Sequence, residues 1–262
     1  MFNRRDPSII ETMKETDDFK KRIADLADRC ERTSSVTSTV FLTPSEQYEL
    51  GTMSFPGSDI KTVLFGGADD CERKAAFFLP YYEDEETFDF SGTIKALKIQ
   101  SYFGEPAHKD YLGAILGLGI ERDRIGDIII SGSTAYVFCI SSVSALLLNE
   151  LEKVGRCGVR VSEISPDSVP GQEKKVKALS FTVKSMRLDA VASNIFGISR
   201  TQTAELIRLG AVSLNYRICE KADAPVDSGA VISIRGKGKG RVVEIGGKSR
   251  KDRLFISAEK YL

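Results

Sequence analysis

Apolar residues near the start of the chain recur at helical spacing, which predicts a long amphipathic helix over residues 8–33. A second helix is predicted to begin at Thr43-Pro44-Ser45-Glu46. A threonine cap, a proline in the first turn and a glutamate at the third helical position together make a capping box. Two apolar runs, residues 62–65 and 75–80, then indicate a pair of short strands.

After an acidic run at residues 83–86, expected to be an exposed loop, the pattern becomes strand, helix, strand, strand, helix, strand. The order βαββαβ is the ferredoxin-like arrangement, which also underlies the RNA-recognition motif. We therefore expect an N-terminal helical unit with a short strand hairpin at residues 1–86 and a ferredoxin-like domain at residues 87–168. The expected strands are residues 94–99, 127–130, 135–140 and 159–164, and the expected helices are residues 108–118 and 141–154.

Polar residues suggest the turns and caps of this central domain. Ser131-Gly132-Ser133 predicts a tight hairpin, and Ser141 or Ser142 is the expected cap of the second helix. Tyr136 and Phe138 lie two residues apart, and so on one face of a strand. They are candidates for stacking RNA bases, as aromatics of the RNA-recognition motif do, or for core positions under a helix. The sequence leaves both open.

A polar, proline-punctuated stretch at residues 166–178 predicts a linker, and residues 181–262 predict a small mixed domain. Its first helix, residues 187–197, ends at a glycine. The second opens on Ser199, with Gln202 completing a reciprocal capping box, and ends at a second glycine. The whole chain is thus expected to be a multidomain α+β protein. Further expected features are strands at residues 212–214, 231–234, 241–245 and 254–256, a turn at Asn215-Tyr216, a loop at residues 236–240 and a hairpin turn at Gly246-Gly247.

Charge divides the chain into two parts. Residues 181–262 hold 15 Lys and Arg against 8 Asp and Glu, a net charge of +7. Because the whole chain is formally neutral, residues 1–180 carry −7. A split of this kind predicts a polyanion-binding module on an acidic body.

Other features of the composition argue against several classes of protein. No apolar run approaches the length of a membrane span, and the first 20 residues are too charged for a signal peptide, so we expect a cytoplasmic protein. Five widely spaced cysteines fit reduced thiols better than disulfides. With a single histidine, His108, and no Cys/His cluster, neither a metal nor another cofactor is expected.

The basic domain offers many side chains for phosphate binding. A helix N-terminus carries unpaired N–H groups and partial positive charge, so the helix that begins with Arg200 suits a phosphate. We expect the cations to converge on a single face, and ion pairs with neighbouring acids would count against this hypothesis. The expected RNA-binding residues are Arg187, Leu188, Asp189, Ser199, Arg200, Gln202, Thr203, Arg208, Asn215, Tyr216, Arg217, Arg235, Lys237, Lys239 and Arg241.

The same segment resembles the S4 RNA-binding domain over about 60 residues. That domain occurs in a small-subunit ribosomal protein, tyrosyl-tRNA synthetases, pseudouridine synthases and ribosome quality-control factors, so the resemblance implies binding of structured RNA. One departure is Tyr216, where the family usually has glycine. The matching motifs are Arg187-Leu188-Asp189, Ser199-Arg200-Thr201, Ala204, Leu206-Ile207, Gly210-Ala211-Val212, Leu214-Asn215 and Asp227-Ser228-Gly229-Ala230-Val231-Ile232.

A narrower resemblance covers about residues 60–262. Residues 108–128, HKDYLGAILGLGIERDRIGDI, are similar to the central segment of the YlmH family, as are residues 72–74 and 77–80. The family usually has His-Arg where this chain has His108-Lys109, a change that keeps the charge. The resemblance implies a bacterial cytosolic S4 protein, typically encoded among cell-division genes. It also implies association with ribosomal large subunits and tRNA in stalled-ribosome rescue and translation quality control.

Three features could indicate catalysis or nucleotide binding, but the residues around each favour a different role. His108 has no identifiable carboxylate partner and nucleophile, so we expect a structural or RNA-contacting role. Asp189 follows Arg-Leu, as the nucleophile of pseudouridine synthases does, but Ala-Val-Ala continues a helix here. The glycine and lysine run at residues 236–240 lacks the Ser/Thr and following helix of a nucleotide-binding loop.

A second candidate contact surface comprises His108, Lys109, Arg122 and Arg124. Arg122 and Asp127 could instead brace the loop between them with a salt bridge, and the sequence leaves both interpretations open.

We therefore expect a monomeric, non-catalytic protein that docks its S4 domain on rRNA or tRNA phosphates. If about six phosphates are neutralised, the logarithm of affinity should fall with the logarithm of salt at a slope of roughly −4 to −5. Two alternatives stay open: an RNA-modifying enzyme that uses its S4 domain for targeting, as pseudouridine synthases do, and a cell-division-linked interaction protein.

Overall fold

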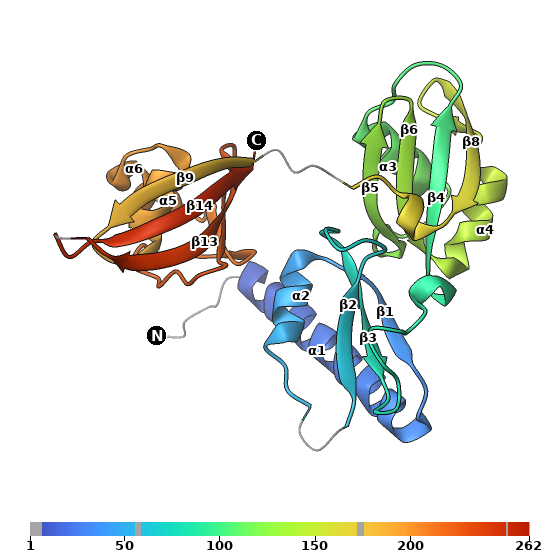
Figure 1. Cartoon of the computed structure of the whole chain (residues 1–262), viewed down its shortest axis with the longest axis horizontal. Helices are drawn as coiled ribbons and strands as arrows, with labels where there is room; N and C mark the ends of the chain where they lie inside the picture. Colours follow the sequence, from blue (N-terminus) through green and yellow to red (C-terminus); the bar gives the residue numbers. More distant parts are fainter. Residues whose placement is uncertain (1–6, 56–58, 172–175, 250, 262) are drawn as a thin grey trace. The chain divides into compact units, whose positions relative to one another are not determined.

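The computed structural model describes residues 7–55, 59–171, 176–249 and 251–261, with side chains from Asp17 onward. The chain forms two compact units, Met1–Gln172 and Glu173–Leu262 (Figure 1). Both units combine helices with antiparallel sheets, which confirms the expected multidomain α+β class. No helix in these ranges is long and apolar enough to cross a membrane.

The first unit begins with α1 (Pro7–Thr33), β1 (Thr37–Leu42), α2 (Pro44–Gly51), β2 (Lys61–Phe65) and β3 (Lys74–Leu79). The three strands form an antiparallel sheet in the order β1-β3-β2. The capping box of α2 is confirmed: the Thr43 N–H donates to Glu46 Oε2 at 2.7 Å, and the Glu46 N–H donates to Thr43 Oγ1 at 3.3 Å.

Strand β1 is absent from the expected elements because the first residues on its buried face are polar. Thr37 and Thr39 are both only 6% exposed. The Thr37 hydroxyl donates to the Leu26 carbonyl at 2.8 Å, and the Thr39 hydroxyl accepts the Ala76 N–H at 2.9 Å. Buried threonines that satisfy their hydroxyls in this way remove the alternation of apolar and polar residues by which a strand is recognised.

The rest of the first unit has the expected ferredoxin-like order. The strands lie as β5-β6-β4-β8-β7 and are antiparallel throughout. The expected serine cap of α4 was wrong, because Ile140 occupies that position without a side-chain bond and Ser144 donates to the Ser141 carbonyl. The helix also ends earlier than expected, since the next residues form β7. The elements are β4 (Ile94–Ser101), α3 (His108–Leu116), β5 (Ile125–Ser131), β6 (Thr134–Ile140), α4 (Ser141–Glu150), β7 (Lys153–Val154) and β8 (Cys157–Ile164), with 3-10 turns at Phe90–Gly92, Arg122–Arg124 and Pro166–Ser168.

The two sheets of the first unit pack on each other, each with helices on its outer side. Strand β3 is apolar on both faces: Phe78 joins the core under α1, whereas Phe77 joins a core that includes residues of the central sheet. The other face of the central sheet packs against α3 and α4. The boundary expected near residue 86 therefore separates two sheets that share one core.

Phe138 belongs to this shared core and is fully buried, so the prediction that it stacks RNA bases was wrong. Its strand neighbours Val137 and Cys139 face the helices, so Phe138 and Tyr136 lie on the opposite face. The expected core position is therefore confirmed for Phe138, but the N-terminal sheet rather than a helix covers it. Tyr136 lies at the edge of the shared core and is only half-buried.

The second unit has two short helices on one face of a six-stranded antiparallel sheet with the order β11-β10-β12-β13-β14-β9. Residues 172–175 of the expected linker lie outside the described residues, and the linker ends before Val176 because β9 begins there. The elements are β9 (Val176–Val183), α5 (Leu188–Phe196), α6 (Arg200–Arg208), β10 (Val212–Leu214), β11 (Arg217–Ile218), β12 (Val231–Ile234), β13 (Gly238–Lys248) and β14 (Leu254–Tyr261).

Two loop assignments in this unit were wrong. The glycine and lysine run forms a turn only up to Lys237, because β13 begins at Gly238, opposite Ile234 of β12. Gly246 and Gly247 lie within β13, where the register with β14 shifts. The hairpin turn follows them, where the Ser249 N–H donates to the Arg253 carbonyl at 2.7 Å.

The shared core of the first unit predicts that Gly126→Ala destabilises the protein. A Cβ at this position would lie 2.7 Å from the Phe41 ring and 3.1 Å from Cβ of Phe138. We expect a loss of about 1–2 kcal/mol in the free energy of unfolding, measured by urea denaturation. Gly113→Ala, on an open face of α3 with nothing within 4 Å, is the control. It should stabilise by about 0.5–1 kcal/mol. Equal effects of the two substitutions would contradict the shared core.

Candidate nucleic-acid interface

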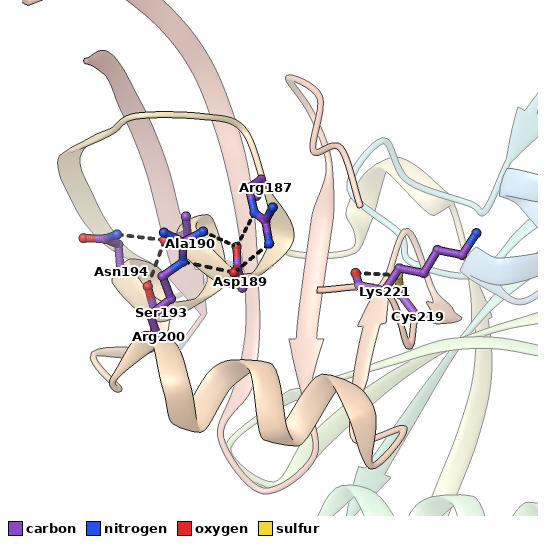
Figure 2. Close-up of polar contacts among 8 residues, drawn as sticks. All are labelled: Arg187, Asp189, Ala190, Ser193, Asn194, Arg200, Cys219 and Lys221. Atoms are coloured by element: carbon purple, nitrogen blue, oxygen red, sulfur yellow. Dashed lines mark hydrogen bonds and ion pairs between the residues drawn. The ribbon is translucent and has the colours of Figure 1, made fainter. Parts of the chain in front are cut away.

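A buried carboxylate in the second unit is held between two arginines (Figure 2). Arg187 donates through Nε and Nη2 to the two oxygens of Asp189, each at 3.2 Å. Arg200 donates through the same pair of nitrogens at 3.0 and 3.1 Å. The Asp189 side chain is 7% exposed, whereas those of Arg187 and Arg200 are 41% and 55% exposed. One carboxylate thus holds two guanidinium groups at the surface.

A loop of residues 219–225 fixes the start of α5, and with it this cluster. The Leu188 N–H donates to the Ala224 carbonyl and the Asp189 N–H to the Ala222 carbonyl, both at 2.9 Å. Within the loop, the Cys219 thiol contacts the Lys221 carbonyl at 3.6 Å (Figure 2). Ordinary helix propensity does not predict these contacts, and no sequence pattern singled out the loop.

The cluster has a net charge of +1, because the two guanidinium groups outnumber the carboxylate. Burial raises the pKa of Asp189, but the hydrogen bonds and charges of Arg187 and Arg200 outweigh it and leave that pKa below its ordinary value. The hydrogen bond to Asp189 raises the pKa of Arg187. Each guanidinium uses Nε and one terminal nitrogen on Asp189, so its second terminal nitrogen can donate to a phosphate.

The same cluster stands at the N-terminus of α6. Ser199 caps the helix and accepts the Gln202 N–H at 3.1 Å. The expected capping box is only half formed, because no bond from the Gln202 side chain back to Ser199 occurs in this part of the described chain. Arg200 is the first helical residue, so a ligand beside its side chain would also face the free N–H groups of the first turn.

Besides the buried Asp189 and the helix cap Ser199, three more of the expected RNA-binding side chains have structural roles. Leu188 and Thr203 are 0% exposed, so they cannot contact RNA, and the prediction for them was wrong. The Thr203 hydroxyl donates to the Ser199 carbonyl at 2.9 Å. The Asn215 side chain accepts the Val231 N–H at 3.0 Å and so fixes the turn at Asn215-Tyr216, where both residues have positive φ.

The expected single cationic face was wrong on both counts set for it: Arg200 is ion-paired with Asp189, and the expected cations do not converge on one face. Lys239 and Arg241 alternate in β13 with Gly240 and Val242, which face the helices, so these two side chains lie on the opposite face. Lys239 Nζ lies 5.1 Å from the centre of the Tyr261 ring on that face.

Four further expected cations lie at the end of α6 or in the strands and turn that follow it. Arg208 ends this helix, and Arg235 lies close by, because its N–H donates to the Ala211 carbonyl at 3.0 Å. Lys237 follows in the same turn, and Arg217 lies in the edge strand β11. All four are exposed. Arg217 pairs with Leu214, which packs on the core under the helices, whereas Arg235 follows Ile234 of that core and so alternates to the other face.

One residue of the second candidate surface, Arg122, braces the loop that follows it. Arg122 donates through Nη1 to the Ile125 and Gly126 carbonyls, and burial lowers its pKa. Arg122 and Asp127 form no salt bridge among the described residues. Asp127 instead accepts the Glu72 N–H at 2.6 Å and the Arg73 N–H at 3.0 Å. Arg124 pairs with Glu121 at 3.5 Å. His108 and Lys109 are exposed at the start of α3.

The chain has no paired cysteines, since all five thiols are free. Burial raises the pKa of Cys71 and of Cys139 to about 12, so both thiols stay protonated at neutral pH. Over the residues described, no three His, Cys, Asp or Glu side chains gather closely enough to hold a metal ion.

Comparisons with known proteins find matches along most of this chain. Residues 186–232 match the S4 domain model, and residues 85–168 match a model described as "Putative RNA-binding domain in YlmH". The ribosome-associated protein quality control protein P2 of Bacillus subtilis (strain 168) is 29% identical over 222 residues, which are 85% of this chain and 86% of that protein. The cell division protein ylmH from Streptococcus pneumoniae matches 63% of this chain and 95% of its own, with 20% identity and a TM-score of 0.46.

A basic S4 domain that follows a ferredoxin-like domain defines the class: this is a multidomain S4 protein with a second candidate RNA-binding domain. Both domain models match in order and the Bacillus relative aligns along most of its length, so the chain is similar to proteins of the YlmH family.

The low pKa of Asp189 predicts a pH-dependent effect of Asp189→Asn. A group with a depressed folded-state pKa stabilises the fold above its unfolded pKa, about 3.9 for Asp, and this contribution is lost as pH falls through the folded pKa. At neutral pH the substitution should cost about 2 kcal/mol of unfolding free energy, because it leaves two arginines without their shared partner. The measurement is urea denaturation from neutral to acidic pH. A difference from wild type that persists unchanged below pH 3 would contradict the account.

Proposed function

We propose that the chain is a non-catalytic RNA-binding protein whose S4 domain docks the helix side of its sheet on the phosphates of structured rRNA or tRNA. The observation that carries the proposal is the pair of guanidinium groups held by Asp189 at the N-terminus of α6. Arginines fixed by a buried carboxylate lose little side-chain entropy when they bind, and their planar donors match phosphate oxygens.

Arg208 extends this surface along α6, and Arg217 extends it at the edge strand β11. Arg208 is eight residues from Arg200, which corresponds to about 12 Å along α6. A row of cations on this scale fits successive phosphates of one RNA strand. Because Lys239 and Arg241 lie on the other face, we count about four phosphates rather than six, and a log–log salt slope of about −3 to −4.

We also propose that the RNA lies on the ribosomal large subunit, where the protein acts in the rescue of stalled ribosomes. The support is the name of the Bacillus relative, a ribosome-associated quality control protein, together with the shared domain order. Action in the cytoplasm as a monomer belongs to the same proposal.

A catalytic role has less support than binding. Asp189 would correspond to a pseudouridine synthase nucleophile, but its carboxylate oxygens accept hydrogen bonds from two arginines. Asp110, the carboxylate nearest in sequence to His108, accepts the Ala107 N–H at 2.9 Å and so caps α3. Neither group is arranged for general acid–base work.

Matched pairs of substitutions test which face docks. Arg208→Ala with Arg217→Ala removes two cations from the helix side, because Arg208 ends α6 and Arg217 pairs across the strands with Leu214, which packs against the core under the helices. Affinity for a tRNA or rRNA hairpin, measured by fluorescence anisotropy, should fall about 10–100-fold, and the salt slope should lose about 1.8. Lys239→Ala with Arg241→Ala removes the same charge from the other face and should change affinity less than threefold. A larger loss of affinity in the Lys239 and Arg241 variant, or an affinity that does not change with salt concentration, would contradict the proposal.

A further inference from the structure

The central sheet of the first unit has one face that is only partly covered. Ala96, Phe138 and Ile164 are cross-strand neighbours on the face away from α3 and α4, and all three join the core shared with the N-terminal sheet. Two residues farther along the strands, beginning at Lys98, the residues on this face become polar and accessible. The structure therefore leaves half of a four-stranded face open.

Two rows of cross-strand neighbours make up the open half. In the first, Lys98 of β4 pairs with Tyr136 of β6 and with Ser162 of β8. In the second, Gln100 pairs with Thr134 and with Arg160. Arg160 and Ser162 are exposed, and Lys98, Gln100 and Tyr136 are half-buried. The Thr134 hydroxyl donates to Gln100 Oε1 at 2.7 Å, which fixes the centre of the second row.

A second aromatic ring lies beyond these rows. Tyr102 follows β4 and is 66% exposed, and its N–H donates to the Gly158 carbonyl at 3.0 Å. A Cβ at Gly158 would lie 3.2 Å from the Tyr102 ring, so the ring rests over the bare backbone of β8. Lys153 of β7 pairs with Gly158 and so lies on the same face. Tyr102 is four residues from Lys98, about 13 Å along the strand.

The cations of this face are available for a ligand. In the part of the chain that the structure describes, Lys98, Lys153 and Arg160 take part in no ion pair. The acid nearest to them in β8, Glu163, alternates to the opposite face, where it pairs with Lys95 at 2.9 Å. An acidic unit thus carries a locally basic patch with two accessible tyrosines.

We propose that this open half-sheet, the patch of Lys98, Gln100, Tyr102, Tyr136, Lys153 and Arg160, binds unpaired nucleotides of single-stranded RNA. The tyrosine rings stack bases, and the lysines and arginine neutralise the phosphates between them. A duplex would hide its base faces from both rings, whereas a loop or tail presents them. The inference rests on the proposed function, because it assigns the structured part of the same RNA to the S4 domain.

The test uses the full chain and two labelled RNA probes: a blunt stem, and the same stem with a single-stranded uridine tail. In wild type the tail should raise affinity at least tenfold, as measured by fluorescence anisotropy. Tyr136→Leu with Tyr102→Leu should remove about tenfold or more of that gain and leave stem binding unchanged. Lys98→Ala with Arg160→Ala should lower the salt slope for the tailed probe by about 1.4. Lys21→Ala with Arg29→Ala, on the exposed side of α1, removes the same charge and should change neither probe.

The possible outcomes separate this inference from the proposed function. Loss of the tail's contribution in the half-sheet variants alone supports the inference. A tail gain that survives in these variants, or an equal loss for both probes, overturns it. Stem binding that still depends on Arg208 and Arg217 would then leave the proposed function standing. If wild type binds neither probe, both proposals fail.

Discussion

The candidate RNA-binding surface depends on one buried carboxylate. Asp189 would be costly to bury alone, and the structure resolves this by giving each oxygen two arginine donors and by fixing the backbone of α5 on the loop of residues 219–225. Because both arginines donate to this carboxylate, Arg187 and Arg200 are held in one orientation beside the N-terminus of α6. The ion pairs with Asp189 do not neutralise the positive charge of the site, because two guanidinium groups share one carboxylate and both remain accessible.

The first unit follows a different rule: burial on both faces of a strand. Since β3 is apolar on both sides, the N-terminal sheet can cover α1 with one face and the central sheet with the other. This arrangement uses half of the central sheet for packing, including Phe138, and leaves Tyr136 at the border. The position of the cover therefore decides which aromatics of a ferredoxin-like sheet can meet a ligand.

Periodicity and caps predicted most elements, because these signals are local. The α2 capping box, the βαββαβ order and the glycine that ends α5 all follow from residues close together in sequence. The errors concern long-range pairing. The residues near Thr37 do not predict that its hydroxyl donates to a carbonyl of α1. Likewise, the residues near Lys239 do not predict which side of β13 faces the helices. The patch around Lys98 was missed for the same reason, since its residues come together only through the register of four strands.

The central claim is that Arg187 and Arg200 meet RNA phosphates while they remain bound to Asp189. The most direct measurement is NMR of the arginine Nε–H groups of the full chain, titrated with a structured RNA hairpin. The account predicts that the Nε–H signals of Arg187 and Arg200, which donate to Asp189, shift on binding while that of Arg241 stays in place. Shifts confined to Arg241, with Arg187 and Arg200 unchanged, would contradict it.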